Sequence, residues 1–276
     1  MAEVTVLVPI RHVEESMLRE AIRSLVEQTL SDLRILLLCT FDPGEIQSIV
    51  SHFEDDRIEF VPCETSDTIT EQLNRGIELA TTELIARADA DDINEPWRLE
   101  RQLAFLKSEP SIAVLGTSLS VINSKGDVIG SRAYPTQHSE IVRSMHFHNS
   151  MAHPSIVFRK DAVTQSGSYQ YSGRPAQDYE LWSRMIQQGI KFANLPEAGV
   201  QYRLHGSSVK SSRQKQTLRS TIDIKRTYWL KTMTLGARLR FWLEHTLLII
   251  PVGLVQRVFA KWHYQPPIAA DVSDGS

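Results

Sequence analysis

The sequence predicts an α/β protein in which a mostly parallel central sheet is flanked by helices. Two observations support this fold class. Short apolar runs alternate with amphipathic helical patterns over residues 4–88, and the long connections between the runs suit parallel strands. The 276 residues, 42% of them hydrophobic, are enough to bury a full core. The sequence therefore predicts one large domain with an appendage.

Strands and helices are expected to alternate from the first apolar run to residue 88. Each strand is almost wholly apolar, as expected for strands covered on both faces, and each helix carries apolar residues three or four positions apart. Ser66 or Thr68 is the expected N-cap of the third helix. In chain order the predicted elements are strand 4–8, helix 17–29, strand 34–38, helix 45–53, strand 58–61, helix 68–80 and strand 84–88.

A fourth helix is expected directly after the polar stretch DADDINEP. Pro96 suits its first turn, and Pro110 ends it. Residues 112–122 return as a strand, which is followed by a turn at NSKGD. From there to residue 202 the pattern is irregular and predicts no clear order of elements.

The three aspartates of this stretch are candidate metal ligands. In open α/β sheets, ligands bind at the carboxyl ends of the strands. If extended geometry persists through Ala90, Asp89 and Asp91 project to the same side, and Asp92 is adjacent. Two such carboxylates suit Mg²⁺ or Mn²⁺, which also bind phosphates. The alternative is an ordinary polar turn in which Asp92 or Asn94 caps the next helix.

Basic residues are concentrated near the C-terminus, although the net charge is only −3. Residues 1–202 contain 18 basic and 29 acidic side chains, whereas residues 203–263 contain 12 basic and 2 acidic ones. This asymmetry indicates an anionic partner, either nucleic acid or phospholipid. High apolar content and the lack of a recognised nucleic-acid module in the segment favour phospholipid.

Residues 211–265 are accordingly expected to form basic amphipathic helices at a membrane surface. The apolar run Leu247–Val255 is shorter than the roughly 20 residues that span a bilayer as a helix, so an interfacial position is expected. The alternative is a helical hairpin, bent at Pro251, that packs on the rest of the chain or on a second subunit. Residues 266–276 are expected to be a disordered tail. The aromatic residues expected at the interface are Trp229, Trp242, Trp262 and Tyr264.

The cysteines and the N-terminus indicate a reducing compartment. Cys39 and Cys63 lie in or beside apolar runs without metal-ligand spacing, and are expected in or near the core. The sequence enters its first strand directly, with no basic leader followed by an apolar segment. The protein is therefore expected to stay in the cytoplasm.

Further motifs follow the aspartates in order: HPSIVFRK, AQDYELWSRM and YRLHGSSVK. Together with LNRGIELATTELIARADADDINEPWRLERQLAFLKSEPSIAVLGT, they resemble family 2 glycosyltransferases, the inverting enzymes that use nucleotide-diphosphate sugars on a GT-A fold. The resemblance covers residues 4–210 and implies a catalytic domain at residues 1–210. It also implies a glycan or lipid-linked acceptor in polysaccharide synthesis. With the basic C-terminal segment, the protein is expected at the inner face of the cell membrane.

The resemblance implies metal ligands and a catalytic base. Asp89 and Asp91, with Asp92 adjacent, match the aspartates that hold Mn²⁺ or Mg²⁺ against the donor diphosphate. Asp178 of AQDYELW matches the base that takes a proton from the acceptor hydroxyl. From the residues alone, Asp178 is equally suited to cap the helix that follows. His205 of YRLHGSS matches a position where histidine approaches the metal or diphosphate.

The expected donor pocket departs from the family pattern at two places. Arg11 follows Pro9 and Ile10 where the family has an aromatic residue and Asn, and Cys39 and Thr40 stand where it has paired acids. Nucleotide recognition is therefore expected to differ from the family pattern, and a non-catalytic subunit that binds a sugar nucleotide or a membrane is the alternative function. The residues expected near the donor are Pro9, Arg11, Thr40, Asn74, Arg75, Arg87 and Asp89.

A third hypothesis is a metal hydrolase that uses His146, His148 and His153. The HFH pair is expected in an ordinary strand, and no motif such as H-E-x-x-H accompanies it. If His153 is not a metal ligand, it is expected to line the acceptor site or to lie in a turn, where Pro154 fixes the backbone. Arg203, before the expected metal histidine, faces either phosphate or an acidic neighbour.

Overall fold

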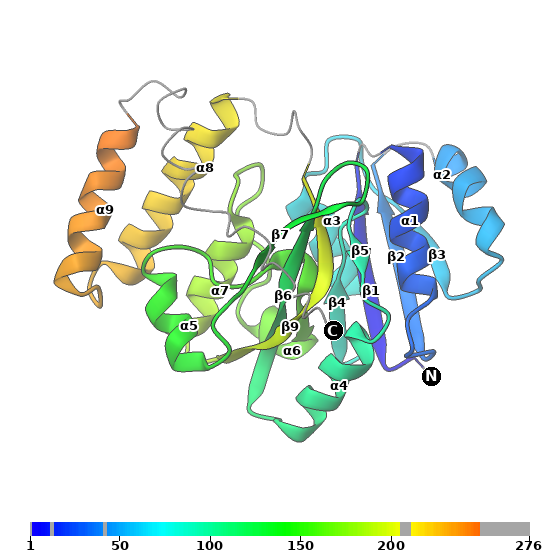
Figure 1. Cartoon of the computed structure of the whole chain (residues 1–276), viewed down its shortest axis with the longest axis horizontal. Coiled ribbons are helices and arrows are strands. Elements are labelled where there is room, and N and C mark those ends of the chain that lie inside the picture. The colour runs from blue at the N-terminus through cyan, green and yellow to red at the C-terminus, as the bar shows by residue number, and fades with distance from the viewer. Residues whose placement is uncertain (1, 12–13, 41–42, 205–210, 249–276) are drawn as a thin grey trace, which may run out of the picture.

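The computed structural model describes residues 2–11, 14–40, 43–204 and 211–248. Helices lie on both faces of a single sheet in this part of the chain (Figure 1). The strands are β1 (Val4–Ile10), β2 (Leu33–Cys39), β3 (Ile58–Pro62), β4 (Leu84–Arg87), β5 (Ile93–Asn94), β6 (Ile112–Ile122), β7 (Val128–Arg132), β8 (Val157–Arg159) and β9 (Lys191–Arg203). The α-helices are α1 (Glu15–Val26), α2 (Pro43–Val50), α3 (Ile69–Leu79), α4 (Arg98–Ser108), α5 (His138–Met145), α6 (Lys160–Gln165), α7 (Gln177–Gln187), α8 (Ser211–Ile224) and α9 (Leu235–Leu247).

The first half of the sheet is parallel, as the alternating pattern predicts. The strand order is β3-β2-β1-β4-β8-β6-β9-β5, with β7 paired to β6. β1 pairs in parallel with both β2 and β4, and β3 pairs in parallel with β2. The predicted elements up to residue 88 are confirmed, with ends that differ by no more than three residues. Thr68 caps α3 in a capping box with Glu71, which decides between the two predicted caps.

Both faces of β1 are buried, which explains its unbroken apolar run. Val4, Val6 and Val8 belong to the cluster formed with α1, α2 and α4, whereas Leu7 belongs to the cluster formed with α3 and α7. The two free cysteines fit their predicted positions, since Cys39 is buried and Cys63 is partly buried.

The second half of the sheet is mixed, and here the sequence pattern predicts little. β8 is antiparallel to β4 and β6, whereas β9 runs parallel to β6. The pairing of β6 with β9 shifts register three times, near Ile112, Thr117 and Ser118. Each shift changes which side chains face the core, so a simple period of two is lost.

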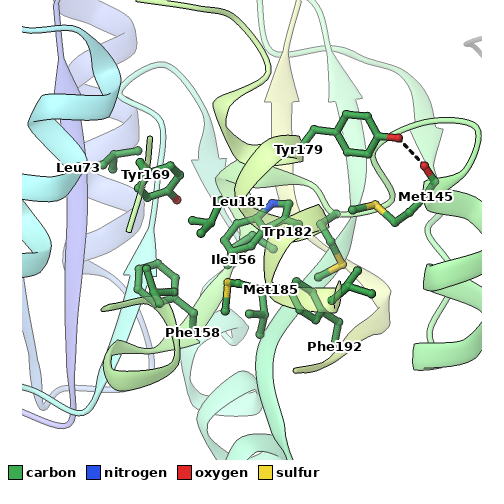
Figure 2. Packing of buried hydrophobic residues seen from close by; sticks show 14 of the residues in the cluster. Leu73, Met145, Ile156, Phe158, Tyr169, Tyr179, Leu181, Trp182, Met185 and Phe192 are labelled. Carbon is green, nitrogen blue, oxygen red and sulfur yellow. Dashed lines mark hydrogen bonds between the residues drawn. The ribbon is translucent and has the colours of Figure 1, made fainter. Parts of the chain in front are cut away.

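The core of this half centres on Trp182 of α7 (Figure 2). Its ring meets those of Phe192 and Tyr169 edge to face, with centroids 5.8 Å and 6.4 Å away. The hydroxyl of Tyr179 donates to the carbonyl oxygen of Met145 (Figure 2). These contacts fix α7 on the sheet, and with it the position of the first turn of the helix.

The C-terminal helices form a hairpin that packs against α7, on the side of the molecule away from α1 and α2 (Figure 1). α8 continues into a π-helical turn, Lys225–Trp229, before α9 begins. Trp229 is buried, and its indole N–H donates to the hydroxyl of Ser183 over 2.8 Å. The buried ammonium of Lys225 pairs with Glu244 of α9 at 2.7 Å.

This packing corrects part of the sequence interpretation. Trp229 is a core residue, so its predicted place at a membrane interface is wrong. The described hairpin reverses between Trp229 and Leu235, whereas the predicted bend at Pro251 lies outside the described residues. The expectations for Trp262, Tyr264 and the tail 266–276 also lie outside them. None of the helices that the structure describes has the length and hydropathy of a membrane span.

Two tryptophans of this hairpin allow a matched test of its packing. Trp229→Ala is expected to lower the free energy of unfolding by about 3–5 kcal/mol, because it empties a buried site. Trp242, which is 59% exposed, is the control, and Trp242→Ala is expected to change stability by less than about 0.5 kcal/mol. Urea unfolding followed by circular dichroism measures both values. Equal effects of the two substitutions would contradict the packing of the hairpin.

Candidate active site

The sheet topology opens a crevice where β1 and β4 end. β1 lies between β2 and β4 in the sheet, and α1, which follows β1, packs on the opposite face from α3, which precedes β4. In open α/β sheets, ligands bind at the carboxyl ends of the strands. A pocket of about 140 Å³ lies there. Its lining comes from the end of β1, from α3 and from the loop after β4, and consists of Pro9, Arg11, Ile69, Gln72, Asp89, Ala90 and Asp91.

The three aspartates lie together at this crevice. One carboxylate oxygen from each of Asp89, Asp91 and Asp92 falls within 4.8 Å of the others. The expectation that extended geometry persists through Ala90 is wrong, because β4 ends at Arg87 and the chain turns at Ala90. The turn, and not strand alternation, brings the carboxylates together.

The cluster fits a hard divalent cation. All three side chains offer carboxylate oxygens, which Mg²⁺ and Mn²⁺ prefer. Oδ2 of Asp92 is buried and has no hydrogen-bond partner. A buried carboxylate oxygen without a donor is costly, and a cation would provide its partner.

The electrostatics of the cluster favour the same interpretation. Burial raises the pKa of Asp89, and the charge of Arg87 opposes that shift. Burial, followed by the negative charge of Asp89, raises the pKa of Asp92 well above its ordinary value. A bound dication would act in the opposite direction on both groups.

Arg87, predicted near the donor, lies beneath the cluster. Its buried guanidinium forms a two-pronged ion pair with the carboxylate of Asp89, in which Nη1 donates to Oδ2 over 3.1 Å. Its charge also lowers the pKa of Asp178, against the larger effect of burial. Arg87 therefore acts on both candidate acidic groups from the protein side of the crevice.

Arg203 holds the aspartate loop in place. Its backbone N–H donates to Oδ1 of Asp92 over 2.8 Å, and its Nε donates to the carbonyl oxygen of Asp91 over 2.9 Å. Its other end pairs with Glu20 of α1 at 2.5 Å. Of the two partners predicted for Arg203, the structure therefore selects an acidic neighbour.

Helix capping does not explain the aspartates. The N-cap position of α4 is Trp97, and no side chain caps it, so the interpretation of Asp92 or Asn94 as a cap is wrong. The side chain of Asn94 instead accepts a hydrogen bond from Arg98. Arg98 also donates to the carbonyl oxygen of Arg87 over 2.8 Å, and burial lowers its pKa to about 9.

Asp178 lies in the first turn of α7, and Ala176, with a left-handed φ of 65°, occupies the N-cap position. The capping interpretation of Asp178 is therefore wrong. The amide of Asn149 donates to Oδ2 of Asp178 over 2.7 Å, and the backbone N–H of Met151 holds that amide through a 3.2 Å hydrogen bond to its oxygen. Burial raises the pKa of Asp178, while the N–H of Tyr179, the charge of Arg87 and the amide of Asn149 lower it.

The other predicted donor residues divide into two groups. Thr40 is buried, and its backbone N–H donates to the carbonyl oxygen of Ile10 over 3.3 Å, between the ends of β2 and β1. Asn74 exchanges hydrogen bonds of 2.9 Å and 3.0 Å with the backbone of Tyr169. Asn74 and Arg75 line a different pocket on α3, so the structure does not bring them to the aspartates. His205 lies outside the described residues.

The three histidines of the hydrolase hypothesis have separate partners. His146 and His148 lie in a turn after α5, not in a strand, and contact Thr232 and Ser144 through 3.3 Å and 3.2 Å hydrogen bonds. His153 begins a 3₁₀ turn and shares a 2.8 Å hydrogen bond with Tyr169. Within the described residues, the aspartate cluster is the sole group of three or more acidic, histidine or cysteine side chains close enough to share an ion.

Sequence reasoning missed two side chains at this site. Gln72 donates to the carbonyl oxygens of Leu38 and Ile10 over 2.6 Å and 3.3 Å, and so joins the ends of β2 and β1. The sequence feature that could have identified Gln72 is its position, as a polar residue, on the apolar face of the predicted helix. Asn149 is the other, and its signal is its place four residues before the start of the HPSIVFRK motif.

The family follows from comparison with known proteins. A family model described as glycosyl transferase family 2 matches residues 5–166. The chain belongs to glycosyl transferase family 2. It is 30% identical over 197 residues to the O-antigen biosynthesis glycosyltransferase WbnJ of Escherichia coli, which covers 70% of this chain and 76% of that protein. The amylovoran biosynthesis glycosyltransferase AmsE of Erwinia amylovora is 27% identical over 248 residues, 88% of this chain and 92% of AmsE.

A solved structure extends the likeness to three dimensions. TarS of S. aureus, residues 1–349 in complex with UDP-GlcNAc, superimposes with a TM-score of 0.62 at 15% identity. The match covers 80% of this chain and 66% of that chain. At this identity the likeness concerns the fold, and it confirms the fold class predicted for a family 2 member.

Asp178→Asn is expected to stabilise the folded chain at pH 7. Because burial raises the pKa of Asp178, the ionised carboxylate is less favourable in the folded than in the unfolded state, and stability is lost as pH rises through the folded pKa. The expected gain is up to about 1 kcal/mol, and it shrinks toward about pH 4. Urea unfolding at both pH values measures it. Asp56→Asn, at an exposed position, is the control; a loss of stability in Asp178→Asn at pH 7 would refute the burial argument.

Proposed function

We propose that this chain transfers a sugar from a nucleotide-diphosphate sugar to an acceptor hydroxyl, with inversion at the anomeric carbon. The observation that carries the proposal is the cluster of Asp89, Asp91 and Asp92 beside the β1–β4 crevice, on a family 2 fold. Asp178, a single carboxylate on α7, is the proposed base. One base and one displacement are what an inverting transfer requires.

The aspartates are the proposed ligands of Mn²⁺ or Mg²⁺. When bound, such a cation stabilises the negative charge that develops on the departing nucleoside diphosphate. Arg87 keeps the carboxylate of Asp89 oriented, and Arg203 keeps that of Asp92 oriented through its backbone N–H. The exposed Arg11, at the end of β1, is the proposed contact of the diphosphate from the opposite wall.

Asp178 is proposed to take the proton of the acceptor hydroxyl as the oxygen attacks the anomeric carbon. Such a base must be ionised, and burial works against ionisation. The amide of Asn149 and the charge of Arg87 restore it in part. Asn149 therefore both orients the carboxylate and adjusts its pKa.

The names of relatives support the class of donor and acceptor. TarS was solved with UDP-GlcNAc, which supports a nucleotide sugar as donor. WbnJ and AmsE are named for O-antigen and amylovoran biosynthesis, which supports a growing glycan, free or lipid-linked, as acceptor. The alternative, a non-catalytic subunit, rests on Cys39 and Thr40, which stand where the family pattern has acids.

The decisive experiment compares wild type with Asp178→Asn. A panel of nucleotide-diphosphate sugars is first screened for Mn²⁺-dependent thermal stabilisation, and nucleotide release is then measured with the donor selected. Asp178→Asn is expected to lower the rate by about 10²-fold or more while nucleotide affinity is kept, because the substitution removes the base and leaves the metal ligands. Asp56→Asn is the matched control. Donor binding without turnover in the wild type, across a broad panel of acceptors, would favour the non-catalytic alternative.

The pH profile tests the role of Asn149. Asn149→Ala removes a hydrogen bond to the ionised form of Asp178, so the pKa of that carboxyl is expected to rise. The acidic limb of kcat/KM should then move to higher pH, with a smaller change at alkaline pH. The control is Asn123→Ala, since Asn123 donates a similar 3.0 Å hydrogen bond to Asp127 in an exposed turn. A uniform loss of activity at all pH values would contradict the proposed effect.

A further inference from the structure

The outward side of α9 carries a concentrated apolar surface. The opposite side of the helix packs on the hairpin and the body of the protein through Ala237, Phe241 and Glu244, which are buried. The exposed side carries the apolar face, defined as Leu235, Leu239, Trp242 and Leu243, which are 86%, 63%, 59% and 57% exposed.

These four residues form one stripe and are not scattered. They recur at intervals of four, three and one positions, which places them on one side of an α-helix. In the part of the chain that the structure describes, the other exposed large apolar side chains are Leu79, Val128 and Ile129, on α3 and β7. α9 is therefore apolar on two opposite sides, and packing among the residues that the structure describes accounts for one of them.

The hairpin that carries the apolar face is rich in basic residues. Residues 211–248 contain eight basic and two acidic side chains. Both acidic side chains are paired, Glu244 with Lys225 in the hairpin and Asp223 with Arg174 at 2.8 Å. Arg238 is exposed on α9 itself, one turn from Leu235 and Trp242.

We propose that the apolar face of α9 docks on an anionic phospholipid surface. In this arrangement the leucines and the indole of Trp242 enter the boundary between headgroups and acyl chains, and Arg238 and its basic neighbours meet lipid phosphates. The proposal concerns a surface away from the aspartate cluster, and does not depend on the proposed transfer reaction.

The charge of the hairpin favours lipid over a second copy of the chain, and the apolar side chains favour lipid over nucleic acid. A second copy docked through the same face would bring two basic hairpins together, which costs free energy. Nucleic acid would use the cations but not four exposed apolar side chains. An anionic bilayer surface offers partners to both kinds of side chain.

Vesicle co-sedimentation of the full chain tests the proposal. Binding is expected to vesicles that contain phosphatidylglycerol, and to be weaker to vesicles of phosphatidylcholine alone. The double substitution Leu239→Gln and Trp242→Gln is expected to lower binding at least about tenfold. Arg238→Gln is expected to lower it about fivefold on phosphatidylglycerol alone. Ile129→Gln, at an exposed apolar position on β7, is the matched control and is expected to bind as wild type does.

Three results would overturn the proposal. Failure of the wild-type chain to bind phosphatidylglycerol vesicles is one, and equal binding by the double variant is another. Light scattering without lipid supplies the third: a dimer that the double substitution dissociates would assign the apolar face to a second copy. The substituted residues are exposed, so circular dichroism is expected to show that the variants keep the wild-type fold. If the double variant misfolds, Arg238→Gln still tests the proposal.

Discussion

Repulsion among Asp89, Asp91 and Asp92 is the constraint around which the crevice is built. Carboxylates that share a space only 4.8 Å wide destabilise one another, and burial of Asp92 increases the cost. Three arginines from three elements surround the group: Arg87 on β4, Arg98 on α4 and Arg203 on β9. They fix the loop but leave Oδ2 of Asp92 without a donor. The described site is thus stable enough to fold and still short of positive charge, which is consistent with the proposed bound cation.

α7 connects this site with the rest of the fold. Its first turn carries Asp178, its middle supplies Trp182 to the core, and its outer side receives Trp229 through Ser183. The same helix therefore positions a candidate base and supports the C-terminal hairpin. The core fixes α7, and the amide of Asn149 and the backbone N–H of Tyr179 both donate to the carboxylate of Asp178. The hairpin is in turn an integral part of the folded unit over residues 211–248, and it leaves the apolar face of α9 exposed.

Sequence reasoning succeeded where the deciding contacts are local. The strands and helices up to residue 88 are predicted by apolar patterns that repeat within short stretches of sequence, and the three aspartates are neighbours in the chain. It failed where the contacts are distant: β6 pairs with β9 across register shifts, and Asn149 meets Asp178 from another segment. Asn74 was misplaced because sequence position does not say which side of a helix faces the pocket, whereas Gln72, two residues away, faces it. Trp229 and Trp242 look alike in a basic amphipathic segment, and only packing separates them.

The wide turn at Lys225–Trp229 sets the angular phase between the two C-terminal helices. A π-helical turn accommodates one more residue than an α-helical turn. Without this wide turn to absorb the extra residue, all that follows would be rotated by about 100° about the helix axis. Trp229 would then miss Ser183, or α9 would present a different side to solvent. Insertions and deletions in this short stretch should consequently be far less tolerated than in an exposed loop, although no candidate catalytic group lies in it.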